Sequence, residues 1–136
     1  MKQDTIVYHE PECRTEVNNL KLLRITLSKE HTKIDFGYQA NDYYIKGGWV
    51  KIGAETFIRM KGSKIKYRLI KGDNIPIGPE KHHFKTTQDW LYFSLYFPEI
   101  PIRHGLIELI ENEPIKFNDF NFWDILLDGE KGYEVN

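Results

Sequence analysis

Alternation between apolar and polar residues is the feature that most narrows what this 136-residue chain can fold into. Apolar side chains occupy every second position of residues 34–38, 65–69 and 91–97, and charged or amphipathic residues fill most positions between them. A strand turns successive side chains to opposite faces, whereas one face of a helix repeats about every 3.6 residues. The pattern therefore predicts half-buried strands that each turn one face toward a core.

Nine strands are expected, because turn segments rich in Gly, Pro, Asn, Asp and Ser separate the apolar runs. Residues 29–30 and 62–63 should close tight hairpins. Residues 105–111 also fit one face of a helix, but Gly105 and Pro114 leave too short a segment for a self-supporting helix, so we expect a strand. The expected strands are residues 5–9, 19–28, 32–40, 48–53, 56–61, 64–71, 88–97, 105–111 and 117–127.

Short strands with a turn about every ten residues are typical of an antiparallel β-sandwich or barrel. The sequence has no internal repeat and no linker, so we expect a single domain over residues 1–136. The alternation also predicts which side chains face the core. These are Ile34, Phe36, Tyr67, Leu69, Leu91, Phe93, Leu95, Ile107 and Ile125.

Composition places the chain among globular domains. Apolar residues make up 40% of the sequence, charged residues make up 29%, and the formal net charge is −1. Cys13 is the only cysteine, which excludes an internal disulfide and metal sites built from several cysteines. No apolar run approaches the ~20 residues that span a bilayer, and the N-terminus lacks the apolar stretch of a secretory signal. We therefore expect a chain without a membrane span.

Charge is distributed unevenly along the sequence. Residues 1–68 hold 13 Lys/Arg against 8 Asp/Glu, and residues 69–136 hold 6 against 12, which predicts a polarised surface. Residues 59–71 carry six cations and no acid. This stretch is either a solvated hairpin face or a contact for a polyanion. The second interpretation leads to one alternative for the whole chain, an OB-like nucleic-acid-binding barrel, although the acidic C-terminal third argues against nucleic acid as the partner.

The spacing of the carboxylates and histidines gives little indication that several of them meet in one catalytic or metal site. A glycosidase needs two carboxyls about 5–10 Å apart, but Glu108 and Glu111 would point to opposite faces of a strand. A small hydrolase that uses the acidic cluster of residues 108–113, which also contains Glu113, is a further alternative. His82 and His83 diverge in an extended chain, so we expect no metal site. No nucleophile motif or phosphate-binding loop is present, so we expect neither a catalytic residue nor a cofactor.

Aromatic side chains supply the binding candidates. They make up 14% of the sequence, and an alternation that turns Leu91 and Phe93 to the core turns their neighbours to the other side of the sheet. Exposed aromatic rings stack on sugars or bases, or anchor protein interfaces, although outward tyrosines are also ordinary cross-strand partners. The candidates are Trp90, Tyr92 and Tyr96 on one strand, and Tyr43, Tyr44 and Trp49 around the turn at residues 41–48.

Several segments resemble an immunoglobulin-like β-sandwich module of Bacteroidetes proteins. Residues 93–101 read F-S-L-Y-F-P-E-I-P, residues 107–111 read I-E-L-I-E, and residues 120–127 read F-N-F-W-D-I-L-L, which is similar to the last strands of that module. Residues 32–36, 52–58 and 66–69 fit its earlier strands, so the resemblance covers a core of about residues 17–128. It implies an accessory role without catalytic residues in an exported protein, often ahead of a thioredoxin-like domain, at a periplasmic or cell-surface location.

Together, the strand pattern and the resemblance predict an all-β, immunoglobulin-like antiparallel sandwich of about seven to nine strands. We expect a non-catalytic interaction module. Its expected partner is another protein or domain, and a surface carbohydrate is the second choice. Nucleic acid is not expected as a partner.

Overall fold

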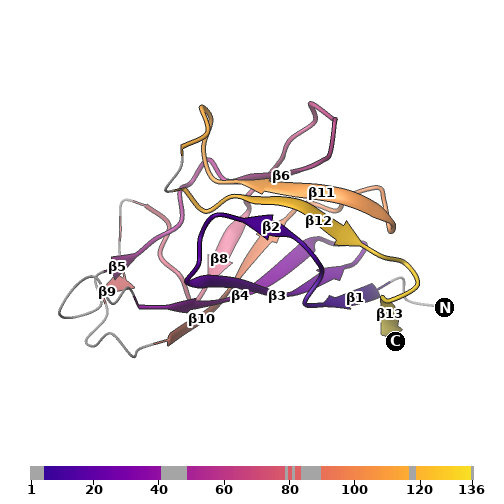
Figure 1. Cartoon of the computed structure of the whole chain (residues 1–136), viewed down its shortest axis with the longest axis horizontal. Helices are drawn as coiled ribbons and strands as arrows, with labels where there is room; N and C mark the ends of the chain where they lie inside the picture. The colour runs from indigo at the N-terminus through magenta and orange to yellow at the C-terminus, as the bar shows by residue number, and fades with distance from the viewer. Residues whose placement is uncertain are drawn as a thin grey trace.

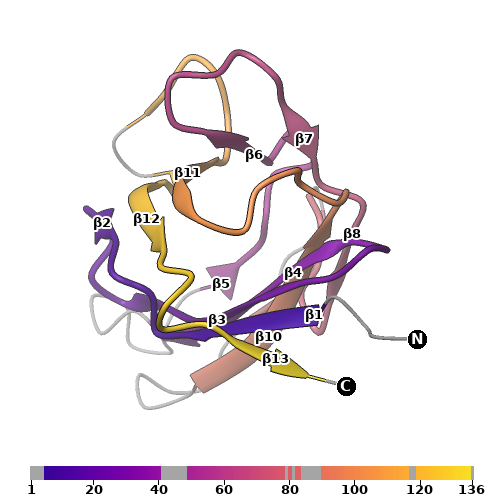
Figure 2. The ribbon, with the colours of Figure 1, turned by 90° about the vertical axis from the view of Figure 1, so that its right-hand side faces the viewer.

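The computed structural model describes residues 5–40, 49–78, 80, 82–83, 90–116 and 119–135. Within these residues every regular element is a β-strand (Figure 1). Two antiparallel sheets face each other, as in a β-sandwich (Figures 1 and 2). The all-β prediction is therefore confirmed. The same residues contain no helix that is long and apolar enough to cross a bilayer.

The lower sheet in Figure 1 has six strands. They are β1 (Thr5–His9), β3 (Leu20–Leu27), β4 (Thr32–Gln39), β8 (Lys71–Asp73), β10 (Trp90–Phe97) and β13 (Tyr133–Val135). Their order is β13-β1-β3-β4-β10-β8. The hairpin predicted at residues 29–30 joins β3 to β4, and Ser28 N donates a hydrogen bond to His31 O across it (3.1 Å). β10 pairs with β4 along its full length, which fixes the faces of both strands.

The upper sheet has five strands in the order β2-β12-β11-β6-β7. They are β2 (Arg14–Thr15), β6 (Phe57–Met60), β7 (Tyr67–Arg68), β11 (Gly105–Ile110) and β12 (Phe122–Leu127). β11 lies between β6 and β12, which confirms a strand rather than a helix at this segment. The short strands β5 (Trp49–Val50) and β9 (His82–His83) pair with each other at one end of the molecule.

The core lies between the two sheets and combines many Leu and Ile side chains with a smaller group of aromatic rings. Phe36 of β4 stacks on Phe93 of β10, with ring centroids 5.2 Å apart, and contacts Phe122 of the opposite sheet at 5.7 Å. Burial is confirmed for most of the predicted core positions, and Tyr67 and Leu69 are only partly buried. The confirmed positions are Ile34, Phe36, Leu91, Phe93, Leu95, Ile107 and Ile125.

The prediction of one strand over residues 64–71 is wrong, because this segment crosses from one sheet to the other. Leu69 N bonds to Thr56 O beside β6 (2.9 Å), and the next amide, Ile70 N, bonds to Tyr96 O in β10 (2.7 Å). Two short strands, β7 and β8, therefore replace the expected long one. The tight hairpin at residues 62–63 is also wrong, since pairing between β6 and β7 is confined to residues 57–58 and 67–68.

Other short elements had no sequence signal. In the described part of the strand expected at residues 48–53, namely residues 49–53, the structure has the two residues of β5, followed by an isolated parallel bridge between Ile52 and Ile77. β2, β9 and β13 have two or three residues each, which is too short for an alternation to appear. They extend or flank the two sheets without changing the core.

Candidate binding surface

The outer face of the six-stranded sheet carries the three aromatic candidates of β10. Directly paired residues of neighbouring strands share one face of a sheet. Trp90 pairs with Gln39, Tyr92 with Gly37, and Tyr96 with Lys33. Trp90 is 44% exposed and Tyr92 is 62% exposed, whereas Leu91 and Phe93 between and beside them are buried. The predicted division of this strand into a core face and an outward aromatic face is confirmed.

Trp90 and Tyr92 form one aromatic surface, called the ring pair below. Their planes are within 12° of parallel and their centroids lie 6.0 Å apart. Both rings lie over Gly37 of β4, where a side chain would begin 3.2 Å from a Tyr92 ring carbon and 3.5 Å from a Trp90 ring carbon. Leu23, at a bulge in β3, reaches the same spot at 3.5 Å. The missing side chain of Gly37 therefore makes room for the rings to lie close to the sheet.

Tyr96 has a different environment and is not part of the ring pair. Its ring lies between two lysines, with Lys71 Nζ 4.7 Å and Lys33 Nζ 5.8 Å from the centroid. The edge of His31 approaches it at 5.0 Å. These contacts leave Tyr96 half-buried. The structure thus separates Tyr96 from Trp90 and Tyr92, and it places two lysines beside the Tyr96 ring.

A polar row separates the ring pair from Tyr96. Arg24 Nε donates a hydrogen bond to Asp35 Oδ2 (2.7 Å), and Ser94 Oγ donates one to Asp35 Oδ1. Asp35 pairs with Ser94 of β10, and Ser94 pairs in turn with Asp73 of β8. The carboxylate of Asp35 is therefore already shared by partners within the sheet.

The remaining aromatic candidates contribute little to this surface. Tyr43 and Tyr44 lie outside the described residues. Trp49 belongs to β5, and its backbone pairs with His83 of β9. His82 and His83 are thus strand residues beside β5, and no group of three potential metal ligands occurs in the described part of the chain.

The basic and acidic segments singled out in the sequence are partners of each other. Arg59 Nε contacts Glu108 Oε1 at 3.1 Å and Arg59 Nη1 contacts Glu113 Oε2 at 3.6 Å, while Lys66 Nζ forms an ion pair with Glu113. The hydrogen bond from Lys66 lowers the pKa of the Glu113 carboxyl. Arg59 and Lys66 both also lie over the Phe57 ring. These charges hold β6, β7 and the loop after β11 together.

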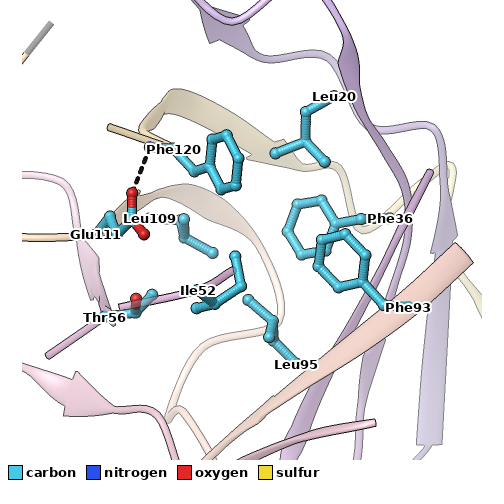
Figure 3. Close-up of a pocket in the computed structure, with 9 residues that line it drawn as sticks. All are labelled: Leu20, Phe36, Ile52, Thr56, Phe93, Leu95, Leu109, Glu111 and Phe120. Carbon is cyan, nitrogen blue, oxygen red and sulfur yellow. Dashed lines mark hydrogen bonds between the residues drawn. The ribbon is translucent and has the colours of Figure 1, made fainter. Parts of the chain in front are cut away.

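The third acid of the cluster, Glu111, is a buried structural residue. Its two carboxylate oxygens accept hydrogen bonds from Gly53 N and Phe120 N, both 2.9 Å long. Figure 3 shows Glu111 at the edge of a group of apolar side chains from both sheets. Burial raises the pKa of this carboxyl against the opposing effect of the two amides. The space within the group is too narrow for a water molecule, so it is packed core rather than a ligand site.

A wider pocket of about 220 Å³ opens beside β12. Trp123, which carries the Arg14 guanidinium 5.9 Å from its ring centroid, forms one wall. Glu16, Lys116 and Asp119 also line the pocket, so its charges are of both signs and select no ligand class.

No protein-family model matches the chain, and neither the curated proteins nor the solved structures compared with it give a match. Function is therefore inferred from the geometry of the outer sheet face. Sequence reasoning missed three contributors to that face, Gly37, Lys33 and Lys71, because only the strand register brings them beside the aromatic residues.

Proposed function

We propose that this chain is a non-catalytic interaction module that binds another protein through the outer face of its six-stranded sheet. An immunoglobulin-like sandwich is the architecture we propose for the two facing sheets. In this proposal Trp90 and Tyr92 are the anchors of the interface.

One observation carries the proposal: two large aromatic side chains lie side by side and exposed on a regular sheet. Tyr92 is 62% exposed and Trp90 is 44% exposed, although burying either ring would contribute to folding. Trp and Tyr are enriched among the interface residues that dominate binding energy. A rigid strand also holds both rings in place before binding, which lowers the entropic cost of association.

Two alternatives receive less support from the same geometry. A nucleic-acid-binding barrel would need the cations of residues 59–71 for phosphates, but Arg59, Lys61, Lys66 and Arg68 face carboxylates within the chain. A hydrolase would need carboxylates that face each other across a cleft. Glu108 and Glu113 instead share one arginine.

A surface carbohydrate is a second candidate ligand, favoured by the near-parallel orientation of the ring pair. Flat aromatic surfaces stack on the apolar faces of sugar rings. A protein partner remains the first choice because Trp and Tyr are enriched among the residues that dominate protein interfaces.

The experiment compares the wild-type chain with Trp90→Ala and Tyr92→Ala in pull-downs and on a glycan array. Each substitution should weaken binding of the partner by about thirty-fold, which corresponds to about 2 kcal/mol for a dominant interface residue. Ile65→Ala is the matched control, because Ile65 is 60% exposed but lies in the loop between β6 and β7 of the other sheet. Equal binding by all four chains would refute the proposed surface.

A further inference from the structure

Among the described residues of β3, β4, β8 and β10, cations outnumber acids on the outer face that carries the ring pair. The register of β3, β4, β10 and β8 places four cations and two acids on this face. Of the acids, Asp35 already accepts hydrogen bonds from Arg24 and Ser94, and Asp73 lies at the edge strand β8. The cations are Lys21, Arg24, Lys33 and Lys71.

The lysines lie in two rows that cross β10, one at Tyr92 and the other at Tyr96. Lys21 of β3 and Tyr92 of β10 both pair with Gly37, so they stand in one row across the sheet. Lys33 and Lys71 stand on either side of Tyr96 in another row. These rows are four residues apart along β10, which is about 13 Å for an extended strand.

Lys21 and Lys71 have no carboxylate partner among the described residues, and Lys33 Nζ is 3.7 Å from the shared Asp35. Positive charge without a local counterion attracts an anionic partner and selects against a cationic one. The ring pair supplies the apolar part of the same surface. An occupant must therefore combine acidic groups with an apolar or aromatic side chain.

We infer that this surface binds an extended acidic segment of a partner protein, with one aromatic or large apolar side chain seated on the ring pair. This inference rests on the proposed function. In an extended segment the side chains of one face recur at the same spacing as the rows of the sheet. An aromatic residue on the ring pair thus places a carboxylate, four positions away, beside Lys33 and Lys71.

The test uses a random copolymer of glutamate and tyrosine as the probe and follows its binding by fluorescence anisotropy. Poly-glutamate, a lysine–tyrosine copolymer and polygalacturonate serve as comparison probes. The wild-type chain should prefer the glutamate–tyrosine copolymer to all three. Binding should weaken at least tenfold between low and high salt, because the contributing charges are exposed.

Charge reversal separates this inference from the proposed function. The double variant Lys33→Glu/Lys71→Glu should lose at least tenfold in affinity for the copolymer, and Trp90→Ala should also weaken binding. Lys64→Glu/Lys116→Glu is the control with the same change in net charge, at exposed positions in the β6–β7 and β11–β12 loops of the other sheet. It should bind within about twofold of wild type.

Several outcomes would overturn the inference. Loss of binding in Trp90→Ala but not in the double reversal would leave the surface in place and reject its acidic ligand. Equal or tighter binding of polygalacturonate, with the same dependence on both variants, would assign the face to an acidic glycan instead. Copolymer binding that neither variant changes would reject the inferred site, and absence of copolymer binding would reject an acidic segment as the ligand.

Discussion

Two single residues, Gly37 and Glu111, show how the surroundings of a residue determine its role in this fold. Gly37 lacks a side chain where two aromatic rings cross β4, and that absence shapes an exposed surface. Glu111 carries a charge where the surroundings are apolar, and its two backbone hydrogen bonds only partly offset the cost of burial. Glu111, which the hydrolase alternative would use, is therefore a structural residue that joins Gly53 to Phe120.

Glu111→Gln should destabilise the fold by about 1–3 kcal/mol at neutral pH, because the amide has one acceptor oxygen for two backbone N–H groups. The effect should depend on pH. Burial raises the pKa of Glu111 in the folded state, so the folded chain holds this proton more tightly than the unfolded chain. The stability contributed by Glu111 then falls as the pH rises from the unfolded value of about 4.3 to the folded pKa.

The measurement is urea denaturation of both chains across this pH range. The stability deficit of Glu111→Gln should shrink as the pH rises through the window and stay constant above it. A deficit that grows with pH would show that the two amides outweigh desolvation and that the folded pKa is lowered.

At the scale of elements, β10 links the core to the candidate surface. Its inward side chains help to fill the space between the sheets, and its outward side chains include Trp90, Tyr92 and Tyr96. β10 pairs with β4 along its full length and with β8 at residues 94–96. The side chains of Trp90 and Tyr92 therefore project from a strand that pairs with β4 at both positions.

Phe93→Ala should cost about 3–5 kcal/mol of unfolding free energy, because Phe93 is buried and stacks on Phe36. Tyr92→Ala, one residue away but facing outward, should cost less than about 1 kcal/mol. Chemical denaturation of the two variants measures this difference. Similar costs at the two positions would contradict the assignment of faces in β10.

The sequence predicts long strands better than short ones. Alternation over five to seven residues located β4 and β10, and it assigned the buried and exposed faces of β10. The turn segments located β3, and the short span between Gly105 and Pro114 favoured a strand at β11. Alternation failed at residues 64–71, since a chain that passes between sheets turns Ile65 and Ile70 to solvent despite their apolar character. The two lysines beside Tyr96 come from β4 and β8, and placing them there requires the strand register, which the hydrophobic pattern alone does not give.

At the scale of the whole molecule, the fold redistributes the charges of the sequence. The basic segment 59–68 and the acidic segment 108–113 lie on neighbouring strands and form ion pairs. At this place the positive charge of the first half of the chain is therefore balanced by the negative charge of the second half. The outer face of the other sheet has lysines beside the half-buried Tyr96 and carries the exposed ring pair nearer the start of β10. One sheet thus pairs its charges within the chain, and the other carries Lys21 and Lys71 without a carboxylate partner among the described residues.

Site-specific photo-cross-linking tests the central claim most directly. A benzophenone amino acid that replaces Tyr92 should give discrete cross-linked products with the partner protein, and the same group at Ile65 in the opposite sheet should give none. The products at position 92 should disappear when Trp90→Ala is added, because the ring pair anchors the partner. Products at position 65 alone, or products at position 92 that persist in the Trp90→Ala background, would contradict binding through this face.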